Sequence, residues 1–320
     1  MGAIAVGVDV GGTKIQSAAM VSEKIAGGHR LMTPLTGAQD VAAAIAEAVS
    51  KALAEAGAQP SDLHAVGLGV PGAIDTDEGT VSSSPNLPGF QGTEPVPLGA
   101  KVSDLLGGVR VRLDNDVRVG ILGEWKRGAG RGYRNLLGVW IGTGVGGGLV
   151  LEDKLYEGQG AAGEIGHTIV KPGGRVCSDG RRGHLEAYAG RARLEAHARH
   201  LAKEGHKTEL FDIMKRKGRT RLSSGVWAEA LEKKDKMAVE LIEDAVEALG
   251  IALCSVQNLL ALEAIIVGGG LGDRLGQPFV HRIEKAMRPQ LFVPDHPPAM
   301  LNTEFGDLSG AVGAAVLAGG

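Results

Sequence analysis

A glycine-rich turn near the start of the chain brings together groups that could bind phosphate and a metal ion. An alternating apolar run over residues 4–10 is typical of a half-buried strand, and a second such run begins at Ile15. The turn between them consists of Gly11, Gly12, Thr13 and Lys14. Because this turn carries few side chains, its backbone N–H groups and the Thr13 hydroxyl can reach phosphate oxygens, and Asp9 could hold a hydrated magnesium ion beside them. An ordinary glycine-rich hairpin turn is the alternative interpretation.

A second turn of the same kind is expected within the apolar segment 136–151. Its Gly-Thr pair, Gly142 and Thr143, is followed by Gly144 and corresponds to the Gly-Thr pair of the first turn. Two such hairpins could hold the phosphates of one nucleotide from two sides. The glycines also match G-x-G-x-x-G, a motif of dinucleotide-binding proteins that must open a helix. Here they lead into another apolar strand and the polar residues 152–154, which predicts a hairpin and excludes an NAD site.

Polar side chains gather where other predicted elements end, and together they suggest a ligand with several hydroxyl groups. They are Asn86, Asn115 with Asp116, Glu164 with His167, and Glu186. Carboxylates and amides suit a sugar because they accept and donate hydrogen bonds in fixed pairs without requiring charge on the ligand. Any one of these residues could instead be a turn residue or a helix cap, and for Asn115 alone the cap is the better interpretation.

The elements that would position these residues alternate between strands and helices. Strands are predicted over 65–70, 109–113 and 263–267, and helices over 40–56, 117–125, 191–203 and 236–262. Asp40 is the predicted N-cap of the first helix. The alternation favours an α/β architecture with largely parallel connections. Residues 75–99 are predicted to form a loop, and the basic segment 205–224 a solvated surface excursion without an assigned role.

Length and composition exclude several classes of function. At 320 residues the chain is long enough for two domains with a sizeable core. A formal charge of −3, without a long basic run, and an aromatic content of 3% argue against nucleic acid as a partner. We find no signal peptide and no uninterrupted apolar run of about 18 residues, so no membrane association is expected. The two cysteines, Cys177 and Cys254, cannot form a disulfide framework, which favours a cytoplasmic location.

Several motifs follow one another in an order that carries a family resemblance. They are DVGGTK at Asp9–Lys14, VPGAID at Val70–Asp75, NLPGF at Asn86–Phe90, LDND at Leu113–Asp116, IGTGVGGG at Ile141–Gly148, EIGH at Glu164–His167, LEAYAG at Leu185–Gly190 and VGGG at Val267–Gly270. In this order the chain resembles the ROK family (repressor, open reading frame, kinase), and within it the bacterial ATP-dependent glucokinases. The resemblance covers nearly the whole chain.

The resemblance implies the two-domain α/β fold of actin-like and hexokinase-type ATPases, which is ribonuclease H-like, with a cleft between the domains. The N-terminal domain would comprise residues 1–116 plus 307–320, and the C-terminal domain residues 117–306. A C-terminal helix over residues 309–317 would return to the first domain. A homodimer or a dimer of dimers is the expected assembly.

The resemblance also implies a reaction, the phosphorylation of a hexose by ATP with Mg²⁺, most closely of glucose at its 6-hydroxyl group. Asp116 would be the catalytic base. The implied sugar-binding residues are Gly72, Asn86, Asn115, Asp116, Glu164, His167 and Glu186. VGGG resembles the adenosine motif of the family, so Gly269 and Gly270 join the two turns as nucleotide-binding residues.

A structural zinc ion is a further implication, and here the chain departs from the family pattern. Members of the family commonly bind zinc through three cysteines of C-x-C-G-x-x-G-C-x-E and the histidine of EIGH. The corresponding residues are Cys177, Asp179, His184 and His167, so one of three thiolates is present. Aspartate and histidine are also zinc ligands. Either these four side chains bind zinc, or hydrogen bonds alone hold the loop.

Other functions fit parts of the pattern. A sugar-sensing ROK repressor would need a DNA-binding module, for which the three residues before Ile4 leave no room. A catalytically inactive binding protein is less compatible with Asp116 beside intact phosphate turns. Among kinases, N-acetylmannosamine, fructose or another hexose could replace glucose, because kinases for these sugars share nearly all the motifs. The sequence does not distinguish ATP from polyphosphate as the phosphate donor.

Overall fold

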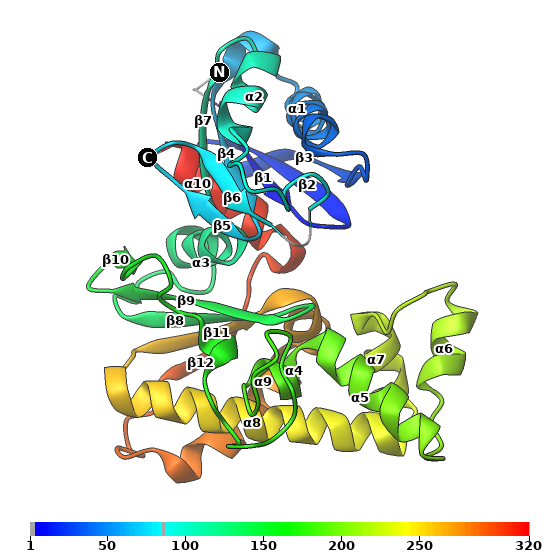
Figure 1. The fold of residues 1–320 in the computed structure, drawn as a ribbon. Coiled ribbons are helices and arrows are strands. Elements are labelled where there is room, and N and C mark those ends of the chain that lie inside the picture. Colours follow the sequence, from blue (N-terminus) through cyan, green and yellow to red (C-terminus); the bar gives the residue numbers. More distant parts are fainter. Residues whose placement is uncertain (1–3, 85–86, 320) are drawn as a thin grey trace. The chain divides into compact units, whose positions relative to one another are not determined.

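The computed structural model describes residues 4–84 and 87–319, and the chain divides into two compact units, each with a sheet and packed helices (Figure 1). Unit 1 comprises Met1–Gly132 together with Asp307–Gly320, and unit 2 comprises Tyr133–Gly306. Each unit contains one of the two predicted glycine-rich turns.

The division of the structure lies one helix beyond the predicted boundary at residue 116. Helix α3 (Asp116–Arg127) belongs to unit 1 because it packs on α10 (Ser309–Gly319), the C-terminal helix. Glycines allow the two helices to approach closely, since a Cβ on Gly313 would lie 1.6 Å from the carbonyl oxygen of Val119. As expected, the C-terminal helix returns to the first unit.

The sheet of unit 1 has the strand order β3-β2-β1-β4-β7. Its strands are β1 (Ile4–Val10), β2 (Lys14–Val21), β3 (Lys24–Met32), β4 (Leu63–Val70) and β7 (Arg110–Asn115). β1 is antiparallel to β2 but parallel to β4, and β4 is parallel to β7. The carboxyl ends of these parallel strands therefore bring Asp9, Gly72 and Asn115 to one edge of the sheet.

Helices cover both faces of this sheet (Figure 1). On one face, apolar residues of β1 and β4 form a core with α1 (Ala38–Glu55) and α2 (Leu98–Leu105). On the other face, Gly7 and Gly67 let α10 lie directly on the strands. A Cβ on Gly7 would lie 1.9 Å from the carbonyl oxygen of Ala311, and one on Gly67 would lie 1.8 Å from that of Ala314. These glycines thus place the N-terminus of α10 near the edge that carries Asp9.

Unit 2 has the sheet order β10-β9-β8-β11-β12, and β11 runs parallel to both β8 and β12. Its strands are β8 (Leu136–Ile141), β9 (Val145–Leu151), β10 (Lys154–Tyr156), β11 (Ala264–Gly268) and β12 (Ala299–Asn302). Its helices are α4 (Glu186–Ala189), α5 (Arg191–Lys203), α6 (Leu210–Arg216), α7 (Ser224–Glu232), α8 (Lys236–Leu260) and α9 (Gly269–Met287). Within the described part of the chain, no helix combines the length and apolarity needed to cross a membrane.

Most predicted elements are confirmed within a few residues, and three local predictions are wrong. Helix α1 begins at Ala38 after Gly37, so Asp40 lies in its first turn and is not the N-cap. The predicted loop 75–99 contains the strand β6 (Thr80–Ser83), which pairs with β5 (Ala73–Asp75) in a small antiparallel sheet. The basic segment 205–224 is not only a surface excursion, because α6 buries Leu210, Ile213 and Met214 in the core of unit 2.

Candidate functional site

The first glycine-rich turn connects β1 and β2, as predicted, and the end of β3 fixes it in place. The Gly11 N–H donates to the Lys14 carbonyl oxygen at 2.9 Å, and the Thr33 hydroxyl donates to the Gly11 carbonyl oxygen at 2.5 Å. The Thr13 residue at the tip is exposed. The ammonium group of Lys14 bonds to Asp307 at 2.8 Å, so this charge is partly neutralised within unit 1.

Asp9 is a partly buried carboxyl group at the end of β1. Burial and the negative charge of Asp116 raise the pKa of Asp9 from 3.8 to about 7, although the Lys14 charge opposes this rise. The start of α10 closes one side, because a Cβ on Gly310 would lie 2.8 Å from Cγ of Asp9. Since nearby negative charge and burial both disfavour its ionised form, a cation would stabilise this carboxylate.

Asn115 caps α3 and also reaches a second loop. Its Oδ1 accepts hydrogen bonds from the N–H groups of Val117 at 3.0 Å and Arg118 at 3.3 Å, which confirms the helix-cap interpretation. Its Nδ2 donates to the Gly72 carbonyl oxygen at 3.4 Å. One side chain therefore holds two of the predicted sugar-binding segments together.

Asp116 follows as the first residue of α3, and its backbone lies over the end of β4. A Cβ on Gly69, the partner of Asp9 in the sheet, would lie 3.4 Å from Cα of Asp116. The carboxylate of Asp116 is partly exposed and accepts from the Val117 N–H at 3.0 Å. Asp9 and Asp116 thus form an acidic pair at the sheet edge, beside the first turn.

Asp114 is a residue of this edge that sequence reasoning did not select. It is buried in β7, forms an ion pair with Arg118 at 3.0 Å, and accepts from the Asn115 N–H at 2.6 Å. These bonds orient the segment that carries Asn115 and Asp116. Its position in the LDND motif is the signal that could have identified it.

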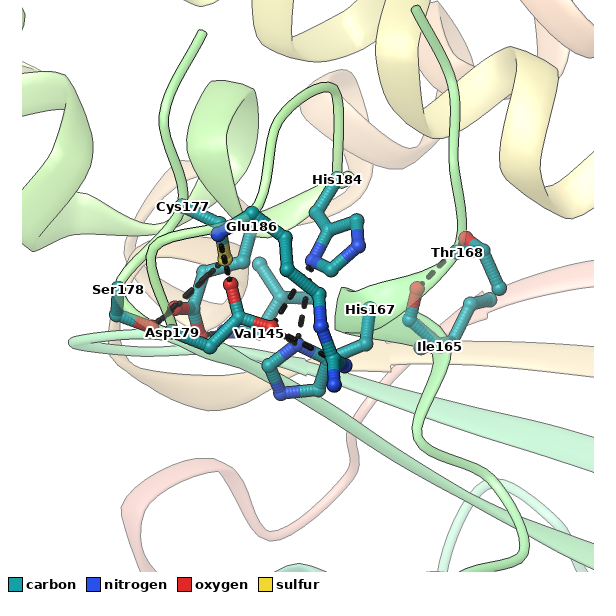
Figure 2. A network of polar contacts seen from close by, with 10 residues as sticks. Val145, Ile165, His167, Thr168, Cys177, Ser178, Asp179, His184 and Glu186 are labelled. Carbon is teal, nitrogen blue, oxygen red and sulfur yellow. Dashed lines mark hydrogen bonds and ion pairs between the residues drawn. The ribbon is translucent and has the colours of Figure 1, made fainter. Parts of the chain in front are cut away.

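The second glycine-rich turn, between β8 and β9, lies directly over Glu186. The Gly142 N–H donates to the Gly144 carbonyl oxygen at 2.9 Å, which closes the turn. Glu186 is buried; its Oε2 accepts from the Val145 N–H at 3.1 Å, and its Oε1 accepts from the hydroxyl of Ser178 (Figure 2). A Cβ on Gly144 would lie 2.2 Å from Oε2 of Glu186, so only glycine fits without displacing this carboxylate.

Figure 2 shows that four potential metal ligands from one region converge. Each of His167, Cys177, Asp179 and His184 offers a ligand atom within 4.8 Å of the others. Oδ2 of Asp179 lies 3.3 Å from Nδ1 of both histidines, and the two Nδ1 atoms are 3.5 Å apart. A thiol, a carboxylate and two imidazoles around one point fit the donor set of a zinc ion.

Two pKa shifts accompany this cluster. Burial raises the pKa of the Cys177 thiol, and a hydrogen bond from the Arg181 N–H lowers the pKa of Asp179. The carboxylate of Asp179 is thus stabilised by the protein, whereas the thiolate of Cys177 would require a cation.

The remaining predicted residues are distributed over both units. Glu164 is exposed and directly precedes a short 3₁₀ turn that contains His167. Gly269 has a φ of 78°, and Gly269 and Gly270 open α9 after β11. Asn86 lies outside the described residues. Unit 1 therefore brings together Asp9, Gly11, Gly12, Thr13, Lys14, Gly72, Asn115 and Asp116, and unit 2 contains the predicted residues from Thr143 to Gly270.

Comparisons with known proteins agree with these motifs. The ROK family model matches residues 5–320. A glucokinase of Halalkalibacterium halodurans is 33% identical over 296 residues, which are 89% of this chain and 87% of that protein. An N-acetylgalactosamine kinase of Shewanella sp. is 30% identical over 324 residues, 98% of this chain and 96% of that protein. The crystal structure of a ROK family glucokinase from Streptomyces griseus, in complex with glucose and AMPPNP, has a TM-score of 0.80 and 31% identity, covering 98% of this chain and 99% of that chain.

The predicted fold class, the α/β fold of actin-like sugar kinases, is confirmed by these comparisons. The chain belongs to the ROK family. Within the family it is a sugar kinase, as the motifs predict.

Proposed function

We propose that this protein is a glucokinase, which transfers the terminal phosphoryl group of ATP to the 6-hydroxyl group of glucose. The observation that carries the proposal is the acidic edge of unit 1, where Asp116 and Asp9 lie beside a glycine-rich turn suited to phosphate. The glucokinase relatives support the choice of glucose.

Asp116 would be the general base of this reaction. The hydroxyl group of a hexose is a poor nucleophile, and a carboxylate within hydrogen-bond reach accepts its proton as the bond to phosphorus forms. The partly exposed carboxylate of Asp116 is accessible for this purpose, and the bonds of Asp114 and Asn115 fix the segment that carries it.

Binding of the nucleotide would use both glycine-rich turns. Phosphoryl transfer depends on positioning and on neutralising charge, which backbone N–H groups of such turns and Lys14 can supply. A magnesium ion held by Asp9 through water would add positive charge to the phosphates. Asp9 suits this role because burial and the charge of Asp116 raise its pKa to about 7. A cation beside it would therefore stabilise the ionised carboxylate. Gly269 and Gly270 would contact the adenosine.

The proposed contacts to the sugar come from Gly72, Asn86, Asn115, Glu164, His167 and Glu186. Glu186 already accepts hydrogen bonds from Val145 and Ser178. A carboxylate has about four acceptor positions, so a sugar hydroxyl can donate to one that remains. Glu186 would then connect the sugar to the turn that binds phosphate.

A zinc ion on His167, Cys177, Asp179 and His184 is part of this proposal, because the four ligand atoms converge. Its role would be structural: it would fix the loop that carries Ser178 and the ring of His167. Protein purified without chelator or added zinc should contain about one zinc per chain by metal analysis. Cys177→Ala should lose the metal and melt at a lower temperature.

The matched control for this measurement is Cys254→Ala. Cys254 is also buried in unit 2, but it bonds to the Gln290 carbonyl oxygen and, among the residues that the structure describes, belongs to no cluster of potential ligands. This variant should retain zinc. An active wild-type enzyme with almost no zinc would show that hydrogen bonds alone hold the loop.

The experiment that tests the proposed function is a phosphorylation assay across a panel of hexoses. Glucose with Mg-ATP should give the highest kcat/KM, and the product should be glucose 6-phosphate. N-acetylgalactosamine, N-acetylmannosamine and fructose complete the panel, since a relative at 30% identity is an N-acetylgalactosamine kinase. Polyphosphate is tested as the second donor. A higher kcat/KM for another sugar would assign the chain to that substrate and contradict the choice of glucose.

A further inference from the structure

Arg191, which no motif predicted as functional, lies against the glycine-rich turn of unit 2. It is the first residue of α5, and two backbone hydrogen bonds fasten this helix to the turn. The Arg191 N–H donates to the Gly142 carbonyl oxygen at 3.1 Å, and the Ala192 N–H donates to that of Thr143 at 2.9 Å. The side chain of Arg191 therefore begins from a fixed point beside the turn.

The guanidinium group of Arg191 bonds to hydroxyl groups from two other segments. Nη2 donates to Oγ1 of Thr143 at 3.3 Å, and Nη1 donates to Oγ of Ser224, the first residue of α7, at 3.0 Å. A Cβ on Gly270 would lie 3.4 Å from both Nη1 of Arg191 and Oγ of Ser224. The guanidinium thus lies beside both segments of unit 2 that the proposed function assigns to ATP.

The positive charge of Arg191 is not neutralised by an ion pair within the described residues. Glu195, one turn further along α5, is already engaged by Arg199 at 2.7 Å and by the Leu222 N–H at 2.9 Å. Burial and the nearby charge of Arg221 lower the pKa of Arg191. Two of its five N–H donors are used by hydroxyl groups, so the remaining donors are available to an anion.

We propose that Arg191 binds a phosphate group of the nucleotide and makes the site select a phosphate chain over uncharged adenosine. The inference rests on the proposed function, since it places ATP in unit 2. A guanidinium group suits this role because its planar donors form charge-assisted hydrogen bonds to phosphate oxygens. The Thr143 and Ser224 hydroxyls would hold it in position before the nucleotide arrives, which reduces the entropy lost on binding.

The test is a calorimetric measurement of binding by the full chain, with Mg-ATP, adenosine and tripolyphosphate as separate ligands. Arg191→Met should weaken binding of Mg-ATP by ~10- to 100-fold, because it removes charge-assisted hydrogen bonds, and should leave adenosine affinity and the KM for glucose unchanged. Arg191→Lys should recover part of the loss. Arg199→Met is the matched control on the same helix and should bind Mg-ATP normally, since Arg199 is paired with Glu195.

The three ligands distinguish the possible roles of Arg191. Weaker binding of Mg-ATP alone supports a nucleotide site, and weaker binding of tripolyphosphate as well supports a site that also takes an inorganic phosphate chain. Arg191→Met with ATP affinity within twofold of the wild type would overturn the inference. An equal loss of adenosine affinity would also overturn the inference. It would show that Arg191 only links Thr143 to Ser224 and supports the fold. If the wild type itself does not bind Mg-ATP, the proposed function fails.

Discussion

Asp116→Asn should lower the kcat for glucose phosphorylation by at least ~100-fold, the usual scale for loss of a general base. Asparagine keeps the shape of the side chain but cannot accept the proton of the sugar hydroxyl. The KM for glucose should change little, because Asn115 still caps α3 and holds Gly72. Steady-state kinetics with saturating Mg-ATP measure both constants. Asp104→Asn, on the exposed surface of α2, is the control and should be as active as the wild type.

The same variant should change the titration of Asp9. The negative charge of Asp116 is one of the causes that raise the pKa of Asp9 to about 7, so its removal should lower that pKa. Asp9 would then ionise at lower pH, which carboxyl ¹³C NMR of metal-free protein can follow. An unchanged Asp9 pKa would contradict the acidic pair, and a near-wild-type kcat would reject Asp116 as the base.

The two glycine-rich turns could be predicted from the sequence because all of their determinants are local. Alternating apolar residues define the strands on either side, and glycines leave only a tight turn between them. The common position of Asp9 and Asn115 at one edge of the sheet can also be predicted from the sequence, since parallel strands place their carboxyl ends together. Predictions of this kind depend on short stretches of chain and on general rules of topology.

Features that depend on tertiary packing could not be predicted from the sequence in the same way. The apolar residues of α6 lie within the longer basic segment 205–224, so the segment resembles a solvated surface although α6 packs in the core of unit 2. The contact between Arg191 and Thr143 joins residues that are 48 positions apart, and no pattern of spacing indicates it. The resemblance supplied the positions of the potential zinc ligands, but only the structure brings their side chains together.

Glu186 illustrates how a residue can be singled out from the sequence while its position in the fold is missed. The sequence suggested a carboxylate for a sugar hydroxyl. The structure places that carboxylate under the second glycine-rich turn, where it accepts from the Val145 N–H. Removing space at this turn should therefore disturb both the turn and the carboxylate.

Gly144→Ala should lower both the stability of the protein and its activity. The new Cβ would lie 2.2 Å from Oε2 of Glu186, so the carboxylate must move and the buried Val145 N–H loses its acceptor. An unpaired buried N–H typically costs ~1–3 kcal/mol, and the displaced turn should reduce kcat/KM by at least ~10-fold. Chemical denaturation measures the first effect, and kinetics with ATP and glucose measure the second.

Gly142→Ala in the same turn separates these effects. A Cβ on Gly142 meets nothing within 4 Å among the described residues, so this variant should keep the stability of the wild type. Any increase in its KM for ATP would then report contact with phosphate alone. In Glu186→Ala the carboxylate is already absent, so adding Gly144→Ala should cost little further stability. If the two losses of stability instead add fully in the double variant, the clash with Glu186 is not the reason that residue 144 must be glycine.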